Sequence, residues 1–229
     1  MVVLLHGCGG MVNAQGQPTA RIRDYAQLLN QQGWHTLAVD SLTPRGEKEL
    51  CTQRTGTRRV TQAERRADAL SALDWLAGQS SVDGQRLALL GWSNGGSTVL
   101  AANNLNHPLV AAAQARHGER LRLAVAFYPG CAADARRGYQ PLAPTLLLLG
   151  GADDWAPAAD CQPLASDRVQ VHTWAGAHHG FDGRAPVVHR ADVPNGAHPG
   201  QGVHVGGHPQ ARAEAQRLLV GALTQAFAR

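Results

Sequence analysis

A serine lies in a segment whose composition suits a nucleophile. Residues 91–96 read GWSNGG, follow the apolar run 86–90 and precede the helix-like stretch 97–102. A strand, a Gly-x-Ser-x-Gly turn and a helix together make the setting of a nucleophile elbow. The flanking glycines suit this tight turn because they carry no Cβ atom. The sequence therefore predicts that Ser93 is a nucleophile, the alternative being a solvated serine in an ordinary glycine-rich turn.

Two adjacent carboxylates follow a later apolar run. Residues 145–149 read TLLLL, and Asp153 and Asp154 come shortly after them. A carboxylate just past the carboxyl end of a buried strand can accept a hydrogen bond from a histidine and fix its tautomer. Adjacent loop residues point in different directions, so only one of the two can serve. The other would cap a helix that we expect to start near Pro157.

Two adjacent histidines follow the next β-rich run, residues 169–174. His178 and His179 lie in a glycine-rich loop. An imidazole titrates near neutral pH and can take the proton of Ser93 as the serine attacks a carbonyl carbon. Again only one of the pair can be the base, and the other would line the pocket. Serine, aspartate and histidine follow one another here in the chain order of α/β-hydrolases.

The first strand runs into a glycine-rich turn that can supply hydrogen-bond donors. Residues 2–5 are apolar, and residues 6–10 read HGCGG. Acyl transfer develops a negative oxygen, which fixed backbone N–H groups stabilise. We expect the amides of Cys8 and of Asn94, the residue after the nucleophile, to form this oxyanion hole.

These segments together resemble the dienelactone hydrolase branch of the α/β-hydrolase superfamily. In the family pattern the acid lies three residues after the glycine at the end of a strand, which selects Asp153, and a His-Gly-Phe ending selects His179. The resemblance implies an ester hydrolase with Ser93, Asp153 and His179 as its triad and with no cofactor. The matching segments keep the family's order from about Val2 to Phe181: 6–10, 40–46, 91–96, 153–157 and 176–181.

Three features depart from the family pattern. The enzymes that name the family use a cysteine nucleophile, so Ser93 implies an ordinary ester as substrate. The chain opens at a strand that normally follows one or two earlier ones, so we expect a sheet without the usual N-terminal strands. Residues 183–208 are rich in Pro, Gly and His and match no family motif. We expect them to form a flap or irregular insertion over the pocket.

Four further residues are expected to contact the substrate. Trp92, Trp155 and Phe181 would line an apolar pocket, and plain core packing is the alternative, above all for Trp92. Arg45 lies in the long polar segment 40–59 and could hold a substrate carboxylate. The alternative, which we favour, is that Arg45 ties this loop to its own backbone.

Four histidines in the C-terminal region are candidate metal ligands. Their spacing matches no zinc motif, and no carboxylate or cysteine stands at a fixed offset. We therefore predict neither a metal nor a cofactor. The histidines are His189, His198, His204 and His208.

Alternating strand and helix patterns predict one α/β domain over residues 1–229, a mostly parallel sheet with helices on both faces. We see no second domain. The expected helices cover 21–32, 61–79, the stretch from the elbow to about 104, 107–119 and 209–228. The expected strands cover 2–5, 34–39, 86–90, 121–128, 145–149 and 168–174.

Composition limits the partners. The net charge is +4 with scattered arginines, and no nucleic-acid module is recognisable. No apolar stretch approaches the ~18 residues that span a bilayer. The first residues do not read as a signal peptide, which favours the cytoplasm, or the periplasm or exterior if a leader has been removed. The substrate is expected to be a small-molecule or polymeric ester; the oligomeric state stays open.

The four cysteines leave two alternatives. Cys131 and Cys161 both follow expected strand ends, and their family-like placement makes one disulfide plausible, which would favour an oxidising compartment. The other alternative is four free thiols in a cytosolic enzyme. The remaining cysteines are Cys8 and Cys51.

The leading interpretation is a serine hydrolase that cleaves carboxylic esters through an acyl-enzyme intermediate. A peptidase, amidase or acyltransferase would use the same triad. A non-catalytic binding protein with this fold, or a metal-dependent hydrolase using the C-terminal histidines, belongs to a different class.

Overall fold

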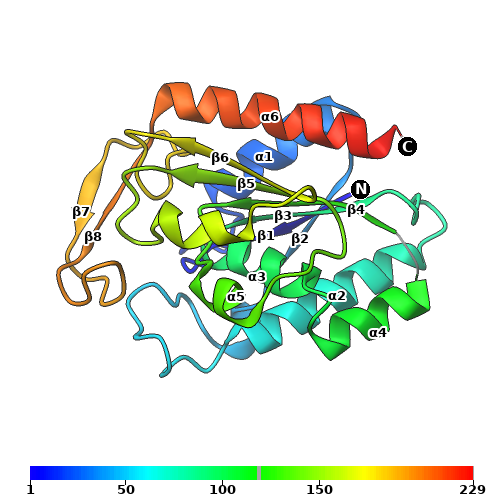
Figure 1. Cartoon of the computed structure of the whole chain (residues 1–229), viewed down its shortest axis with the longest axis horizontal. Coiled ribbons are helices and arrows are strands. Elements are labelled where there is room, and N and C mark those ends of the chain that lie inside the picture. Colours follow the sequence, from blue (N-terminus) through cyan, green and yellow to red (C-terminus); the bar gives the residue numbers. More distant parts are fainter. Residues whose placement is uncertain (118–119, 229) are drawn as a thin grey trace.

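A six-stranded parallel sheet forms the centre of the computed structural model, which describes residues 1–117 and 120–228. Its strand order is β2-β1-β3-β4-β5-β6 (Figure 1). The strands are β1 (Val2–Leu5), β2 (Thr36–Val39), β3 (Leu87–Trp92), β4 (Leu121–Phe127), β5 (Thr145–Gly150) and β6 (Val169–Trp174). All six expected strands are present, and their ends differ from expectation by at most two residues.

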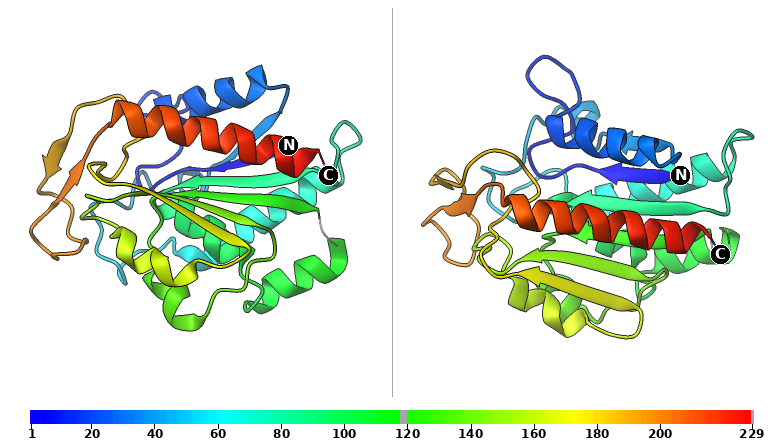
Figure 2. Two further views of the ribbon diagram at one scale, coloured as in Figure 1. Left: turned by 45° about the horizontal axis from the view of Figure 1, so that its top comes forward. Right: turned by 90° about the horizontal axis from the view of Figure 1, so that it is seen from above.

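Helices cover both faces of this sheet. On one face lie α1 (Ala20–Gln31) and α6 (Pro209–Phe227) (Figures 1 and 2). The other face carries α2 (Gln62–Ala77), α3 (Asn94–Asn103), α4 (Pro108–His117) and α5 (Ala132–Arg137). Two 3-10 turns, η1 (Thr43–Arg45) and η2 (Ala158–Leu164), complete the elements around the sheet. The sequence pattern predicted neither the short α5 nor η1, whereas η2 lies where a helix was expected to start near Pro157.

Alternation along the strands divides the apolar side chains between two cores. In β1, Val3 and Leu5 belong to the core beneath α2, α3 and α4, whereas Val2 and Leu4 belong to the core beneath α1 and α6. Successive strand residues point to opposite faces, and both faces here are covered. This explains why the central strands, such as β1, β3 and β5, read as nearly continuous apolar runs.

The strand order changes direction between β1 and β3. The chain adds β2 on one side of β1 and every later strand of this sheet on the other side. In open α/β sheets ligands bind outside the carboxyl ends of the strands at such a switch point. The loop after β1 and the turn after β3 meet at this place.

The C-terminal insertion is more regular than the sequence predicted. It contains a short antiparallel hairpin, β7 (Val188–Arg190) paired with β8 (Val203–Val205). The hairpin lies at the end of the sheet opposite to both termini (Figure 1). The amide of Gly206 donates to the carbonyl of His179 at 3.0 Å, so the insertion is attached directly to the loop of the candidate base. None of the described helices is both long and apolar enough to cross a membrane.

Candidate active site

Ser93 lies at a turn that leaves no room for side chains at positions 91 and 95. Its φ of 54° and ψ of −119° are rare for a residue with a side chain. A Cβ on Gly91 would lie 2.3 Å from the carbonyl oxygen of Gly95, and one on Gly95 would lie 2.0 Å from that of Leu5. Both glycines are therefore required for β3 to turn directly into α3. The turn leaves Ser93 half-buried at the start of α3, above the carboxyl edge of the sheet.

A continuous chain of hydrogen bonds joins Ser93, His179 and Asp153. His179 Nε2 lies 2.8 Å from Ser93 Oγ, and His179 Nδ1 lies 2.8 Å from Asp153 Oδ2. A carboxylate oxygen accepts hydrogen bonds, so Nδ1 carries the ring proton and donates a hydrogen bond to Asp153. Nε2 is then free to accept from the Ser93 hydroxyl. The imidazole is thus held in the tautomer that general-base catalysis needs.

Asp153 is fixed on its other side as well. Its Oδ1 accepts from the amides of Trp155 and Ala156, each at 2.8 Å. Asp153 and His179 are only 6% and 4% exposed, so water competes little for these bonds. The loop after β5 therefore presents one carboxylate oxygen to its own backbone and the other to His179.

The neighbouring acid and histidine take different roles. Asp154 does not cap a helix near Pro157 as expected. Its Oδ2 accepts from His204 Nδ1 at 2.7 Å and its Oδ1 from the His204 amide at 2.8 Å. Burial alone would raise the pKa of Asp154, but these hydrogen bonds outweigh it and lower the pKa. His178 is half-buried, and its ring lies 5.6 Å from that of His204.

Two aromatic rings lie against the imidazole of His179. The ring centroids of Tyr128 and Trp155 are each 4.6 Å from that of His179. Tyr128 has a positive φ of 38°, and its hydroxyl donates to the buried Asp182 at 2.5 Å. Asp182 also accepts from Arg21 Nε at 3.1 Å. This network fixes the ring beneath the candidate base.

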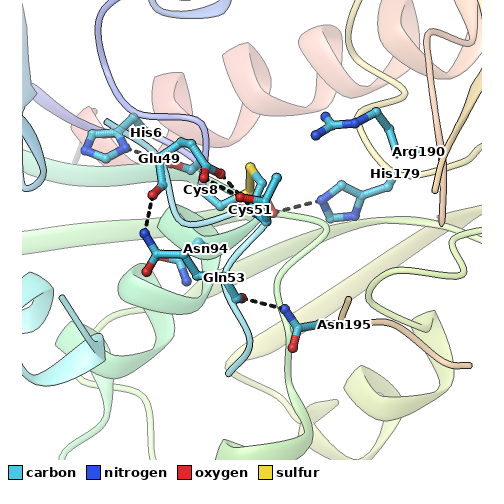
Figure 3. Close-up of a disulfide and its surroundings, with 12 residues drawn as sticks. His6, Cys8, Glu49, Cys51, Gln53, Asn94, His179, Arg190 and Asn195 are labelled. Atoms are coloured by element: carbon cyan, nitrogen blue, oxygen red, sulfur yellow. Dashed lines mark hydrogen bonds between the residues drawn. A yellow bond between two sulfur atoms is a disulfide. The ribbon is translucent and has the colours of Figure 1, made fainter. Parts of the chain in front are cut away.

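The two expected oxyanion donors lie at the switch point. Asn94 is the first residue of α3, so its amide has no acceptor within the helix. The carbonyl of Gly7 accepts from Gly10 N at 3.3 Å and lies 2.7 Å from His6 Nδ1. In a trans peptide the N–H points away from the carbonyl, so the Cys8 amide is directed away from these donors. Figure 3 shows Cys8 and Asn94 in the neighbourhood of His179.

A buried arginine, which the sequence analysis missed, bridges the loops that carry these amides. Arg65 on α2 is fully buried; its Nη2 donates to the carbonyl of His6 at 2.6 Å and its Nη1 to Asn94 Oδ1. Burial lowers the pKa of Arg65 to about 10, which still leaves it charged at neutral pH. Spacings of four and eleven residues place Arg65 on the helix face of the buried Ala69 and Leu76, a signal that could have found it.

All four cysteines are in disulfides. Cys131 pairs with Cys161, the pair considered from the sequence, and Cys8 pairs with Cys51, which the sequence did not suggest. No free thiol remains, so the alternative of four free thiols is wrong for this structure. The second disulfide connects the first loop to the polar segment 40–59.

Of the three aromatic residues expected at the substrate pocket, one lies at the site and two are buried in the core. Trp155 lies at the site against His179. Trp92 is 1% exposed and packs 4.9 Å from the ring of Tyr25, as the core alternative proposed. Phe181 is completely buried, with its ring 5.5 Å from that of Tyr128. Side-chain burial therefore removes Phe181 from the pocket surface.

Arg45 is held by a carboxylate from the protein itself. Its two terminal nitrogens each donate to Asp68 at 2.8 Å, and Nη1 also donates to the Ser41 carbonyl at 2.8 Å. The bidentate pair occupies the guanidinium face that would bind a substrate carboxylate. The bond to Ser41 ties the loop to its own backbone, as in the favoured alternative, and the pair with Asp68 ties the loop to α2, which the sequence did not predict.

A cavity of about 470 Å³ adjoins the first loop. It lies between that loop, the start of α1 and the segment after His179, and Trp92 and Tyr25 form part of its lining. Gly7 borders the cavity, and a Cβ on Gly7 would lie 3.6 Å from that of Ser93. Gly7 is thus adjacent to both the cavity and Ser93, whereas Ser93, Asp153 and His179 do not line the cavity themselves. Across residues 1–117 and 120–228, no group of three or more His, Cys, Asp or Glu side chains is arranged to hold a metal ion.

The parallel sheet, the elbow after β3 and the order of the site residues define an α/β-hydrolase fold. Solved structures with this fold are similar over nearly the whole chain. A monoacylglycerol lipase from Paleococcus ferrophilus is 17% identical with a TM-score of 0.59, over 98% of this chain and 94% of that one. A dienelactone hydrolase-like promiscuous phosphotriesterase from metagenomic libraries is 22% identical with a TM-score of 0.58, over 98% and 85%.

Esterase 2 of Thermogutta terrifontis, phosphorylated by paraoxon, is 19% identical with a TM-score of 0.56, over 96% of this chain and 79% of that one. A search of curated proteins gave no match. The sequence profile of the dienelactone hydrolase family matches residues 1–215. The chain belongs to the dienelactone hydrolase family, and it is a carboxylic ester hydrolase.

Proposed function

We propose that the protein cleaves carboxylic esters through an acyl-enzyme formed on Ser93. His179 takes the hydroxyl proton as Oγ attacks the ester carbonyl carbon, and then gives that proton to the leaving alcohol. Water attacks the acyl-enzyme in the second half, again with His179 as base, and the acid is released. Asp153 orients the imidazole and stabilises its charged form.

One observation carries this proposal: the unbroken hydrogen-bond chain from Ser93 Oγ through His179 to Asp153, with both links at 2.8 Å. A serine hydroxyl is a poor nucleophile at neutral pH unless a base is in hydrogen-bond contact. The neighbouring His178 and Asp154 are not part of this chain of hydrogen bonds. Asp154 is instead bonded to His204. The geometry thus supports one choice from each adjacent pair.

The amides of Cys8 and Asn94 would hold the oxyanion in both halves of the reaction. Fixed donors at this position stabilise the transition state more than the ground state, because charge develops there only during the reaction. The buried charge of Arg65, hydrogen-bonded to the side chain of Asn94 and to the carbonyl of His6, adds a favourable field. Removal of one such donor typically costs about 10²- to 10³-fold in kcat.

The cavity beside Gly7 is the proposed site for one half of the ester. It borders the loop that carries the proposed Cys8 donor, and its lining includes Ile22 and the charged Arg21, Asp24 and Arg184, which suits a group with both apolar and polar parts. The phosphorylated Thermogutta esterase 2 shows that a relative in fold reacts with an organophosphate. We expect the same class of reagent to label Ser93 here.

Matched neighbour variants test the assignment. We expect His179→Gln and Asp153→Asn to lower kcat for a p-nitrophenyl ester by about 10³- to 10⁴-fold, because the base or its tautomer is lost. His178→Gln and Asp154→Asn should retain activity within about tenfold. Equal losses in both members of a pair, with all variants folded by circular dichroism, would contradict the roles proposed for His179 and Asp153.

A further inference from the structure

We propose that Cys51 is a positioning residue for the oxyanion hole. Its disulfide to Cys8 holds the Cys8 amide in place, so that ester hydrolysis depends on this one bond being oxidised. The inference rests on the proposed function, because it assigns a catalytic task to the amide of Cys8. It adds that a residue 43 positions away from Cys8, outside the hydrogen-bond chain of Ser93, controls the rate.

The loop that carries the amide has few anchors of its own. Residues 6–10 read HGCGG, and Gly10 has a φ of 84°. Glycine loses more conformational freedom on ordering than any other residue, so three glycines in five residues make this loop costly to fix. Only His6 and Cys8 have side chains with which to hold it. The loop therefore needs support from another part of the chain.

Cys51 supplies that support from the polar segment 40–59. Its sulfur is bonded to that of Cys8, and the amide of the preceding residue, Leu50, donates to the carbonyl of Cys8 at 2.7 Å. Side chain and backbone of Cys8 are thus held from the same side. In Figure 3 the disulfide is drawn with His6 on one side of it and the side chain of His179 on the other.

The disulfide is the centre of a separate apolar cluster. Cys8 and Cys51 are 6% and 8% exposed and pack with Leu42, Leu50 and Val60, apart from the two cores of the sheet. The half-buried Trp155 packs against this cluster, and its ring lies against His179. The disulfide therefore supports the oxyanion loop directly, and the cluster around it packs against Trp155, whose ring lies against the proposed base.

Segment 40–59 has its own attachment to the insertion. Asn195 Nδ2 donates to the carbonyl of Gln53 at 2.9 Å, and the amide of Thr55 donates to Asn195 Oδ1 at 2.9 Å. If the disulfide opens, segment 40–59 keeps these bonds, but the sulfur link to the oxyanion loop is lost. Opening should therefore affect the Cys8 amide more than the fold as a whole.

Opening of the Cys8–Cys51 disulfide should lower kcat. The amide is proposed to bind an oxygen that becomes negative only in the transition state, so a displaced amide weakens transition-state binding selectively. We expect kcat to fall by about tenfold to 10²-fold, less than the loss for complete removal of a donor. KM should change by less than about threefold.

Variants separate this role from general stabilisation by disulfides. Cys51→Ala, Cys8→Ala and the double variant should show the same loss in kcat, because each removes the same bond. The matched control is Cys131→Ala with Cys161→Ala, which removes the other disulfide and should retain kcat. The variants that lack Cys8, Cys51 or both should also discriminate less between an ester and its thionoester. The sulfur of a thionoester accepts hydrogen bonds weakly, so the thionoester gains little from an intact oxyanion hole.

Reduction of the folded protein provides a second test that needs no substitution at Cys8 or Cys51. A dithiol such as dithiothreitol donates two electrons and two protons, opens the disulfide to two thiols and leaves as its own cyclic disulfide. The control variant without Cys131 and Cys161 isolates the Cys8–Cys51 bond, and alkylation with mass spectrometry reports its state. Activity should fall as the two thiols appear and return on reoxidation.

Full activity of the reduced control variant, or of Cys51→Ala, would overturn the inference. A failure of the proposed function is distinguishable, because the oxidised wild-type protein would then be inactive toward the ester before any reduction. An equal loss in the Cys131 and Cys161 control would also overturn it, because it would show a general effect of disulfides on stability.

Discussion

The ring of Trp155 lies against the ring of His179, with their centroids 4.6 Å apart and their planes inclined by 41°. The amide of Trp155 also donates to Asp153 Oδ1 at 2.8 Å. One residue thus contacts the proposed base through its side chain and the proposed acid through its backbone. The two contacts can be separated by substitution, because only the first depends on the indole.

Trp155→Ala should lower kcat by about tenfold while leaving the fold intact. The backbone bond to Asp153 remains, but the imidazole loses a packed neighbour and gains freedom to leave Ser93. Trp155→Phe should restore most of the rate because a ring remains. Steady-state kinetics on a p-nitrophenyl ester measures both, and identical rates for alanine and phenylalanine would show that the ring contact is unimportant.

Arg65→Met should lower kcat by about 10²-fold. It removes the bonds to the His6 carbonyl and to Asn94 Oδ1 and takes a buried positive charge from beside the developing oxyanion. Arg66→Met, at the next position of α2, is the matched control and should stay within about twofold. Thermal unfolding must be recorded alongside, since unchanged kinetics in a folded Arg65→Met protein would refute the electrostatic role.

The stability of the protein should decrease as the pH falls from about 6.5 to about 4. Burial and the nearby charge of Arg65 lower the pKa of His6 to about 4. The unfolded chain therefore takes up a proton near pH 6.5 that the folded protein refuses until about pH 4. Through this window His6 alone contributes a loss in the free energy of unfolding of about 1.4 kcal/mol per pH unit.

Denaturant unfolding at several pH values measures this slope. His6→Asn, whose amide can still donate to the Gly7 carbonyl, should be less stable at pH 7 but should lose stability less steeply toward pH 4. A slope equal to that of the wild type would show that other groups dominate the acid response.

Gly95→Ala should abolish folding or activity altogether. The added Cβ would lie 2.0 Å from the Leu5 carbonyl and 2.5 Å from that of His6, so β1 and α3 could not keep their contact. Gly221→Ala is the control, because a Cβ there meets nothing within 4 Å and alanine favours the helix. Soluble yield and circular dichroism distinguish the two, and a folded, active Gly95→Ala protein would contradict the elbow geometry.

The central strands β1, β3, β4 and β5 could be predicted because they are buried on both faces. Residues 146–149 are all apolar, and such a run, being too short for a typical buried helix, favours a strand. The hairpin β7–β8 could not be predicted in this way. Its two strands have three residues each, and its partners, Asp154 and the carbonyl of His179, come from distant parts of the chain.

The direction of single side chains limited the prediction of the site. Phe181 follows His179 by two residues, yet its ring points into the core beneath α6, beside Trp174. Position in the chain gave its distance from the base but not its orientation. Arg65 and Cys51 were missed for a related reason: their effect depends on contacts with the first loop, 59 and 43 residues away.

The most direct test of the central claim is the reaction of a fluorophosphonate with wild-type protein and with Ser93→Ala, followed by intact-mass and peptide mass spectrometry and by hydrolysis of a short p-nitrophenyl ester. We expect the wild-type protein to hydrolyse the ester and to carry one adduct, located on Ser93, whose formation stops hydrolysis. Ser93→Ala should remain folded, unlabelled and inactive. Full hydrolysis by Ser93→Ala, or an adduct on another residue that stops the reaction, would contradict the account.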